Sequence, residues 1–264
     1  MSRIVKWPVA LTVAGSDSGG GAGIQADLKT FAALGVHGAS VITCLTAQNP
    51  RRVLAIEPCS PQIVRRQMEA VFEELRPAAV KTGMLFSAEI IRAVAVFFNQ
   101  PKRPLLVVDP VMISTSGAPL LKPAALKMLR EQLLPLATLV TPNLDETEVL
   151  TGRKIVSVEN MRMAAREIHA RFGCAALVKG GHLRGLRDAV DIFYDGRTEL
   201  LLSAPFIKGV LTHGTGCTYS AAIVAALAAN HDLPRAVEIG KRHVTAAIAR
   251  SYRIGKHSAL GHFA

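Results

Sequence analysis

The segment Thr212-His213-Gly214-Thr215-Gly216-Cys217-Thr218 carries the strongest chemical signal in the chain. It precedes a run of small residues that predicts a helix. Free backbone N–H groups and the positive end of the helix dipole at such a start hold an anion, and they stabilise negative charge on a transferred phosphoryl group. In the first turn, the pKa of the Cys217 thiol is expected to fall below its usual value of about 8.5. On this segment alone, a capped helix with a structural cysteine explains the pattern equally well.

Polar side chains also follow three apolar runs that predict strands. Asp109 ends the first run. Asn143 and Glu146, which are three residues apart, follow the second run, and Lys179 ends the third. Carboxylate and amide oxygens suit a largely hydrated Mg²⁺ ion, although each residue alone could be a helix cap or a surface charge. Because ligands of parallel α/β sheets bind beyond the carboxyl ends of the strands, these residues together predict a site for nucleotide phosphates.

Residues 15–23, here called the glycine loop, follow the first predicted strand and contain five glycines. We expect their N–H groups to face a ligand; a merely flexible turn is the weaker interpretation. Residues 21–26 fit the dinucleotide pattern G-x-G-x-x-A, but the acid expected about 20 residues later is absent, and Gln48 stands in that region. The chain has no P-loop, G-x-S-x-G or H-E-x-x-H motif, which counts against P-loop kinases, common hydrolases and common zinc proteases.

Short β-branched runs alternate with longer helical patterns along the whole chain. This alternation predicts an α/β fold with a central, mostly parallel sheet and helices on both faces, in one domain over residues 1–264. Asp195-Gly196 predicts a hairpin turn. The predicted strands are 9–14, 39–46, 53–57, 79–82, 105–109, 138–141, 175–179, 190–194 and 199–203. The first predicted helix follows the glycine loop and ends at residue 34. The others span 62–75, 88–98, 123–134, 145–150, 160–172, 217–230 and 235–252.

Composition narrows the classes of protein. With 264 residues and 50% hydrophobic content, the chain can bury a full core. No apolar run reaches the roughly 18 residues of a membrane helix, and the four cysteines form no metal-finger spacing, so we expect a cytoplasmic protein with reduced thiols. The net charge of +11 is spread along the chain without the interleaved aromatic residues of single-strand binders. We therefore expect a small-molecule substrate and no nucleic acid or membrane partner; a homodimer stays open.

Taken together, these segments resemble the hydroxymethylpyrimidine/phosphomethylpyrimidine kinases of thiamin synthesis, which have the ribokinase-like fold. The resemblance runs from about residue 10 to 255 and includes Ile24-Gln25-Ala26-Asp27, Lys81-Thr82-Gly83-Met84 and His213-Gly214-Thr215-Gly216-Cys217. It implies ATP and Mg²⁺ as cofactors. The tail after Lys256 departs from the family, because it lacks the usual Pro-Leu-Asn. By position, the resemblance implies that the pyrimidine is surrounded by Gly15, Asp27, Gln48, Met84 and Val111, the ATP phosphates by Lys179, Asn143 and Thr212, Mg²⁺ by Asp109 and Glu146, and the transferring group by Gly214, Thr215, Gly216 and Cys217.

Two of these implied roles have alternatives. At the position of Cys217, ribokinase has an aspartate that acts as the catalytic base. The Cys217 thiol is therefore either a base or part of an anion hole. Gln48 either binds the ring through its amide or ties down the turn at Asn49-Pro50.

The predicted function is phosphoryl transfer from ATP to 4-amino-5-hydroxymethyl-2-methylpyrimidine and then to its monophosphate. A pyridoxine/pyridoxal kinase of the same fold is the nearest alternative. A dinucleotide-dependent oxidoreductase and a silent anion-binding regulator are more remote. The oxidoreductase lacks its acid, and the regulator would be expected to lose Cys217, Asn143 or Glu146, which are all present.

Overall fold

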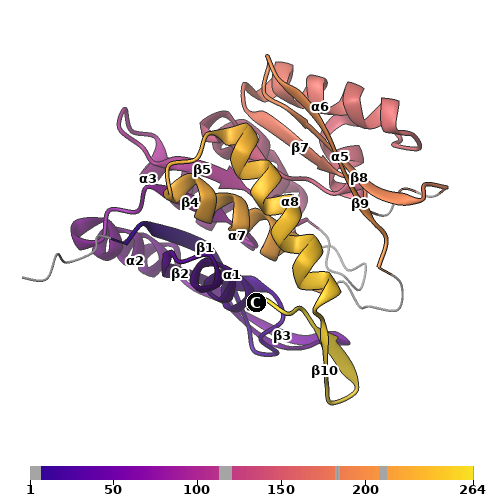
Figure 1. Ribbon diagram of the computed structural model, residues 1–264. Helices are drawn as coiled ribbons and strands as arrows, with labels where there is room; N and C mark the ends of the chain where they lie inside the picture. The colour runs from indigo at the N-terminus through magenta and orange to yellow at the C-terminus, as the bar shows by residue number, and fades with distance from the viewer. Residues whose placement is uncertain (1–6, 113–120, 182, 184, 208–212, 264) are drawn as a thin grey trace, which may run out of the picture.

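A nine-stranded sheet runs through the protein in the order β3-β2-β1-β4-β5-β6-β7-β8-β9 (Figure 1). The computed structural model describes residues 7–112, 121–181, 183, 185–207 and 213–263. The strands are β1 (Val9–Asp17), β2 (His37–Asn49), β3 (Arg52–Pro58), β4 (Ala79–Thr82), β5 (Leu105–Val108), β6 (Leu139–Val140), β7 (Ala175–Lys179), β8 (Asp188–Tyr194), β9 (Glu199–Pro205) and a separate C-terminal hairpin of β10 (Tyr252–Ile254) and β11 (His257–Ala259).

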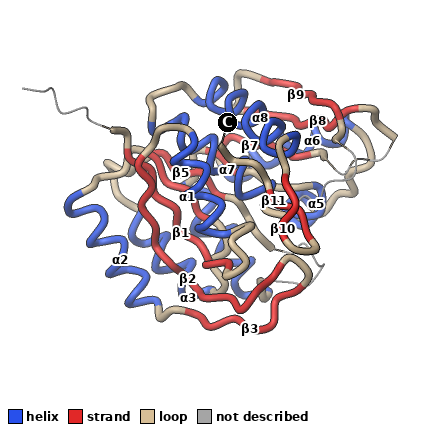
Figure 2. Tube along the Cα trace, turned by 60° about the horizontal axis from the view of Figure 1, so that its bottom comes forward, coloured by secondary structure: helices blue, strands red, loops and turns tan. Residues whose placement is uncertain are grey.

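The six central strands of the large sheet, from β2 to β7 in the sheet order, are parallel. Among the described strands of this sheet, antiparallel pairing occurs toward the edges, where β3 pairs with β2 at one end and β8 and β9 follow β7 at the other. Figure 2 shows β3 beside β2 and β8 and β9 near β7. The prediction of a mostly parallel sheet is confirmed. The carboxyl ends of the central strands therefore meet along one edge, where the polar residues of the sequence motifs gather.

Helices cover both faces of the sheet, as predicted. Along β5, Leu106 and Val108 join the core beneath α2, α3 and α6, whereas Val107 joins the core beneath α1, α7 and α8. This alternation follows from the two-residue period of a strand. The helices are α1 (Gly23–Ala33), α2 (Pro61–Glu74), α3 (Ala88–Phe98), α4 (Pro123–Met128), a π-helical turn (Leu129–Leu133), a 3₁₀ turn (Leu134–Leu136), α5 (Leu144–Thr151), α6 (Val158–Phe172), α7 (Thr215–Ala228) and α8 (Leu233–Ala249).

Two predicted helices end differently in the structure. The helix predicted over 123–134 is α-helical only to Met128 and then continues as π-helical and 3₁₀ turns, because Pro135 cannot donate a backbone hydrogen bond. The helix predicted to reach Tyr252 stops at Ala249, and the chain turns back at Gly255, which has a φ of +53°. None of the helices in the described residues is long and apolar enough to cross a membrane.

A buried ion pair joins α1 to the centre of the sheet. Lys81 of β4 donates to Asp27 of α1 at 2.7 Å, and Thr12 of β1 donates to the same carboxylate at 2.6 Å. All three side chains are fully buried. Burial disfavours the Lys81 cation, but Asp27, Cys217 and Asp109 together outweigh it and raise the pKa of Lys81. Burial also raises the pKa of Asp27, against the effect of Lys81 and Thr12. The pair therefore fixes α1 against β1 and β4, and each group has a bonded partner.

We predict that Lys81→Met lowers the free energy of unfolding by about 3–5 kcal/mol, because it leaves the Asp27 carboxylate buried without its partner. Urea unfolding followed by circular dichroism measures the change. The exposed pair Arg235–Glu238 supplies the control, and Glu238→Gln should cost under about 1 kcal/mol. Equal small losses for both variants would show that the buried pair does not hold α1 in place.

Candidate active site

A cavity of about 650 Å³ opens at the carboxyl ends of the central strands. It brings together residues that lie more than 200 positions apart in the chain, from the glycine loop after β1 to the start of α7. The predicted site residues that line it are Gly15, Gln48, Met84, Asp109, Val111, Asn143, Glu146, Lys179, Gly214, Thr215, Gly216 and Cys217. Thr212 lies outside the described residues.

The segment of residues 213–217, here called the anion loop, ends at the first turn of α7. Gly214 is the N-cap of α7 and has a φ of +84°. A side chain at this position would collide with the carbonyl oxygen of Gly21, so both the backbone conformation and the space require glycine. A helix start of this kind presents N–H groups and the positive end of the dipole to the cavity.

Two charged side chains lie directly beside the anion loop, one half-buried and one buried. A Cβ atom built on Gly216 would stand 3.3 Å from Lys179 Nζ and 3.8 Å from Asp109 Oδ2. Lys179 donates to Asp109 at 3.1 Å, and Ser220 of α7 donates to the same carboxylate at 3.1 Å. The absence of a side chain at Gly216 thus leaves the lysine ammonium open to a group bound at the start of α7.

The electrostatics of this pair favour both charged forms. Burial opposes the charge on Asp109, but Lys179 and Lys81 lower the pKa of its carboxyl below the usual value. Burial also opposes the charge on Lys179, and Asp109 and Glu146 raise the pKa of its ammonium. The pair is therefore ionised at neutral pH.

The Cys217 thiol differs from its prediction. Its pKa is raised to about 11, mainly because burial disfavours the thiolate and because Asp27 and Asp109 lie nearby. Lys81 and a hydrogen bond from the Gly23 N–H group oppose this shift without cancelling it. The expectation of a lowered thiol pKa is wrong, since desolvation exceeds the effect of the helix start. Cys217 keeps its proton at neutral pH.

Asn143 and Glu146 form a capping box at the start of α5. The Asn143 N–H group donates to Glu146 at 2.8 Å, and the Glu146 N–H group donates to Asn143 Oδ1 at 2.9 Å. Burial and the nearby Asp109 raise the pKa of Glu146 to about 7, against the effect of Lys179. Both residues are helix caps and also line the cavity. The interpretation as a helix cap and the interpretation as part of a binding site are therefore compatible.

Asp27 is expected to contact the pyrimidine, but in the structure it does not line the cavity. Its carboxylate is fully buried in the ion pair with Lys81, and it is Lys81 that lines the cavity. The expectation of direct contact between Asp27 and the pyrimidine is corrected accordingly, because the sequence shows Lys81 in a strand but not that this side chain lies between Asp27 and the cavity.

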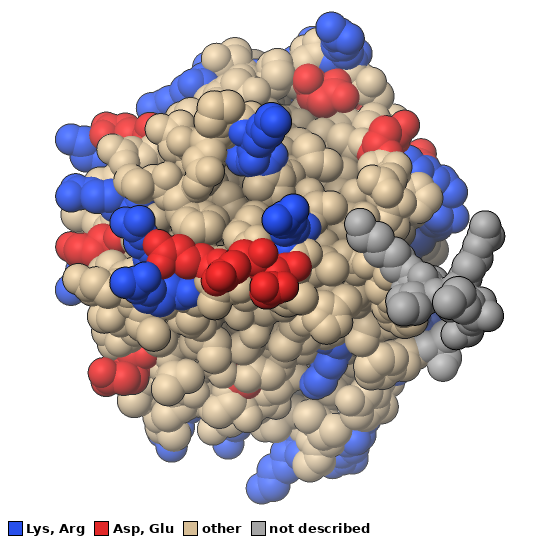
Figure 3. Space-filling view, turned by 90° about the vertical axis from the view of Figure 1, so that its left-hand side faces the viewer, with Lys and Arg blue, Asp and Glu red and all other residues tan. Residues whose placement is uncertain are grey.

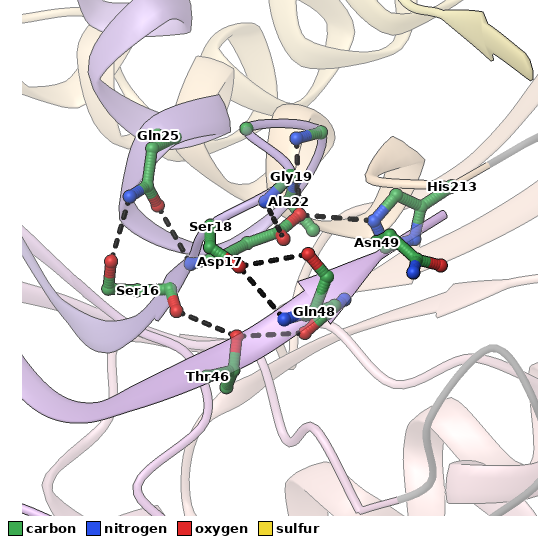
Figure 4. A network of polar contacts seen from close by, with 12 residues as sticks. Ser16, Asp17, Ser18, Gly19, Ala22, Gln25, Thr46, Gln48, Asn49 and His213 are labelled. Atoms are coloured by element: carbon green, nitrogen blue, oxygen red, sulfur yellow. Dashed lines mark hydrogen bonds and ion pairs between the residues drawn. The ribbon is translucent and has the colours of Figure 1, made fainter. Parts of the chain in front are cut away.

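The glycine loop also corrects an expectation. The N–H groups of Gly19, Gly21 and Ala22 donate to the carboxylate of Asp17 at 2.8, 3.1 and 2.9 Å (Figure 4). These three groups therefore face a side chain of the loop itself and not a ligand. The sequence contained a signal for this, since an aspartate before a turn often accepts hydrogen bonds from the backbone that follows it.

Gln48 lies at the end of β2 with its side chain beside Thr46. Thr46 Oγ1 is 3.1 Å from Gln48 Oε1 and 2.8 Å from the carbonyl oxygen of Ser16. The following turn is held by Asn49, whose side chain accepts the N–H groups of Arg51 and Arg52. The Gln48 amide therefore does not hold the turn, and ring binding by Gln48 stays a prediction.

His262 in the C-terminal tail was not anticipated from the sequence. Its Nε2 atom lies 3.1 Å from Thr218 Oγ1 in the first turns of α7, and it is 6% exposed. Burial, Lys29 and His243 together lower the pKa of the imidazole to about 4. The C-terminal tail thus contacts α7, the helix that begins in the anion loop, through a neutral histidine.

Comparisons with known proteins agree with this arrangement. A model of the phosphomethylpyrimidine kinase family matches residues 17–262. A hydroxymethylpyrimidine/phosphomethylpyrimidine kinase of Rhizobium meliloti is 53% identical over 248 residues, which cover 93% of this chain and 92% of that protein. A thiamine biosynthesis bifunctional protein of Geobacter sulfurreducens is 49% identical over 253 residues, which cover 96% of this chain and 51% of that protein. The crystal structure of an ADP complex of Bacillus subtilis pyridoxal kinase has a TM-score of 0.90 at 38% identity, covering 97% and 98% of the two chains.

We predict that His262 makes the stability depend on pH below neutrality. The unfolded chain takes up a proton on this imidazole below about pH 6.5, whereas the folded protein resists it until about pH 4. The contribution of His262 to the free energy of unfolding is therefore complete above pH 6.5 and is lost as the pH falls toward 4. Between pH 7 and 4.5, wild type should lose about 2 kcal/mol more than His262→Gln.

Urea unfolding at both pH values measures this difference. The glutamine amide can still bond to Thr218, so the variant changes titration more than packing. Parallel losses of stability in the two proteins would contradict the prediction.

Proposed function

The chain belongs to the phosphomethylpyrimidine kinase family, and we propose on this premise that it phosphorylates 4-amino-5-hydroxymethyl-2-methylpyrimidine and then the monophosphate, using ATP. The product is the pyrimidine diphosphate of thiamin synthesis. One observation in the structure carries the proposal: the Cβ position of Gly216 is 3.3 Å from Lys179 Nζ. A helix start and a lysine ammonium thus converge on one point of the cavity, as the transfer of an anionic group requires.

Phosphoryl transfer demands mainly positioning and stabilisation of charge. In the first transfer, the bond from the γ-phosphorus to the β,γ-bridging oxygen breaks, a bond to the hydroxymethyl oxygen forms, ADP leaves, and the hydroxyl proton passes to an oxygen of the phosphates. In the second transfer, the accepting oxygen is one of the monophosphate's own phosphate oxygens. Negative charge on the transferring group falls between the α7 start and Lys179. Cys217 is protonated, so it acts as a neutral hydrogen-bond donor in this anion hole and does not remove the hydroxyl proton.

Asp109 and Glu146 would hold Mg²⁺ together with the nucleotide phosphates. The donor set fits this ion, because Mg²⁺ keeps several waters and needs only one or two carboxylates from the protein. No group of three His, Cys, Asp or Glu side chains in the described residues forms a metal cage, which agrees with a largely hydrated ion. When bound, Mg²⁺ supplies neutralisation of phosphate charge.

Pyridoxal kinase activity is the second candidate, favoured by the similarity to the Bacillus subtilis structure. The identity of 53% to the Rhizobium meliloti kinase favours the pyrimidine as the better substrate. The oxidoreductase alternative loses support, because three N–H groups of the glycine loop already bind Asp17. The silent regulator loses support too, since Cys217 and Glu146 are in place around the cavity.

The cysteines and the surface charge bear on the location of the enzyme and on its partners. The four cysteines are free thiols, which supports a cytoplasmic location. The face shown in Figure 3 carries Lys and Arg interspersed with Asp and Glu, so the net charge of +11 forms no continuous basic patch on that face. This distribution supports small-molecule substrates over nucleic acid. Sedimentation velocity distinguishes a monomer from a homodimer.

We predict that the purified protein with ATP, Mg²⁺ and the hydroxymethylpyrimidine gives first the monophosphate and then the diphosphate. Mass spectrometry of timed samples distinguishes the two products. Chelation of Mg²⁺ should stop both steps, because the ion neutralises the phosphate charge, and without it the carboxylates of Asp109 and Glu146 repel the phosphates. Absence of both products with all components present would overturn the assignment.

We predict that Gln48→Met lowers kcat/KM for the pyrimidine by about 5–150-fold, the equivalent of leaving one buried polar partner unpaired. Methionine keeps the volume but offers no amide to the ring nitrogen and its adjacent amine. Pyridoxine has no exocyclic amine and should lose less.

A matched control is Gln67→Met on α2, which removes side-chain bonds to Ile42 outside the cavity lining. It should leave the ratio of the two kcat/KM values unchanged. Equal losses for both substrates in Gln48→Met would mean that this residue supports the strand end and does not bind the ring.

A further inference from the structure

Asp17, the last residue of β1, connects two loops that approach the cavity from opposite ends of the chain. Its carboxylate accepts the Gly19 N–H group through Oδ1, and those of Gly21 and Ala22 through Oδ2. His213 Nε2 of the anion loop lies 3.2 Å from Oδ2. Figure 4 shows the carboxylate between the turns of the glycine loop and the imidazole. Asp17 is 3% exposed, so water does not compete for these bonds.

The two loops also touch backbone to backbone. A Cβ atom on Gly21 would stand 2.8 Å from His213 Cδ2, and one on Gly214 would collide with the carbonyl of Gly21. Gly15 and Ser16 of the glycine loop line the cavity on one side, and the anion loop lines it on the other. A displacement of either loop would therefore change the distance between the acceptor and the transferring group.

The charge of Asp17 suits the position it occupies. Three backbone N–H groups around one carboxylate form the kind of concave site that elsewhere binds a phosphate. Burial opposes the charge, but the bonds from His213, Gly19 and Ala22 outweigh it and lower the pKa of Asp17. The carboxylate remains ionised at neutral pH and fills this site permanently.

We propose that Asp17 is a positioning residue: an internal anion that occupies the N–H groups of the glycine loop and holds the anion loop against the acceptor side of the cavity. A phosphate of either substrate is thereby directed to the start of α7. The inference rests on the proposed kinase function and adds to it a residue that lines the cavity but acts through the two loops, because they take up both oxygens of its carboxylate.

The test is the rate of the first phosphorylation in Asp17→Ala, with and without added formate. We expect kcat to fall about 10- to 100-fold, with KM for ATP changed by less than about 3-fold. Formate, which can replace the missing carboxylate, should raise kcat of the variant saturably and leave wild type unaffected. Chloride at equal ionic strength should have no effect.

Asp195→Ala is the matched control, because Asp195 also accepts two backbone N–H groups in a turn, those of Arg197 and Thr198, outside the cavity lining. Its kcat should stay at the wild-type value with no response to formate. Wild-type kcat in Asp17→Ala, or a loss that formate does not restore in a folded variant, would overturn the inference. Inactive wild type would instead refute the kinase function.

His213 keeps the proposal testable if Asp17→Ala does not fold. His213→Leu removes the donor to Asp17 from the other loop and should lower kcat about 3- to 10-fold, with little change in melting temperature. His213→Gln can place its amide nitrogen near the Nε2 position and should retain most of the rate. Equal kcat in both variants would contradict a role for the contact between the loops.

Discussion

Five ionisable side chains, in which acids and lysines alternate, lie beside one another at the carboxyl edge of the sheet: Asp27 of α1, Lys81, Asp109, Lys179 and Glu146 of α5. Each lysine is stabilised as a cation by the two carboxylates beside it, and Asp109 is held ionised by both lysines. Charges this deeply buried persist only when they are paired, because desolvation of a lone ion costs several kcal/mol. The sheet order places β4, β5 and β7 so that the lysines and Asp109 come together, and the start of α7 lies over them. The topology therefore determines where a phosphoryl group can be held.

The second constraint is the close packing of the glycine loop on the anion loop. Gly21 and Gly214 leave no room for side chains, so the acceptor side of the cavity and the α7 start are in direct contact. With Cys217 protonated, the site offers donors and cations in place of a strong nucleophile. This composition matches a reaction in which positioning and charge stabilisation supply most of the catalysis.

Much of this arrangement could be predicted from the sequence. Apolar periodicity predicts the sheet and its helices, and the rule that ligands bind at strand ends is sufficient to place Asp109 and Lys179 at one edge. The pKa of Cys217 could not be predicted, because it depends on burial and on Asp27, 190 positions away, whereas the sequence shows only the helix start. The burial of Asp27 and the brace from His262 depend likewise on contacts between distant segments. The single domain over the whole chain stays a prediction.

We propose that the cavity favours the aminopyrimidine and that any pyridoxine activity is secondary. A competition assay measures this preference: equal concentrations of hydroxymethylpyrimidine and pyridoxine react with limiting Mg-ATP, and mass spectrometry quantifies all phosphorylated products at low conversion. The product ratio equals the ratio of the two kcat/KM values. Pyrimidine phosphates should predominate. An excess of pyridoxine phosphate would contradict the proposal.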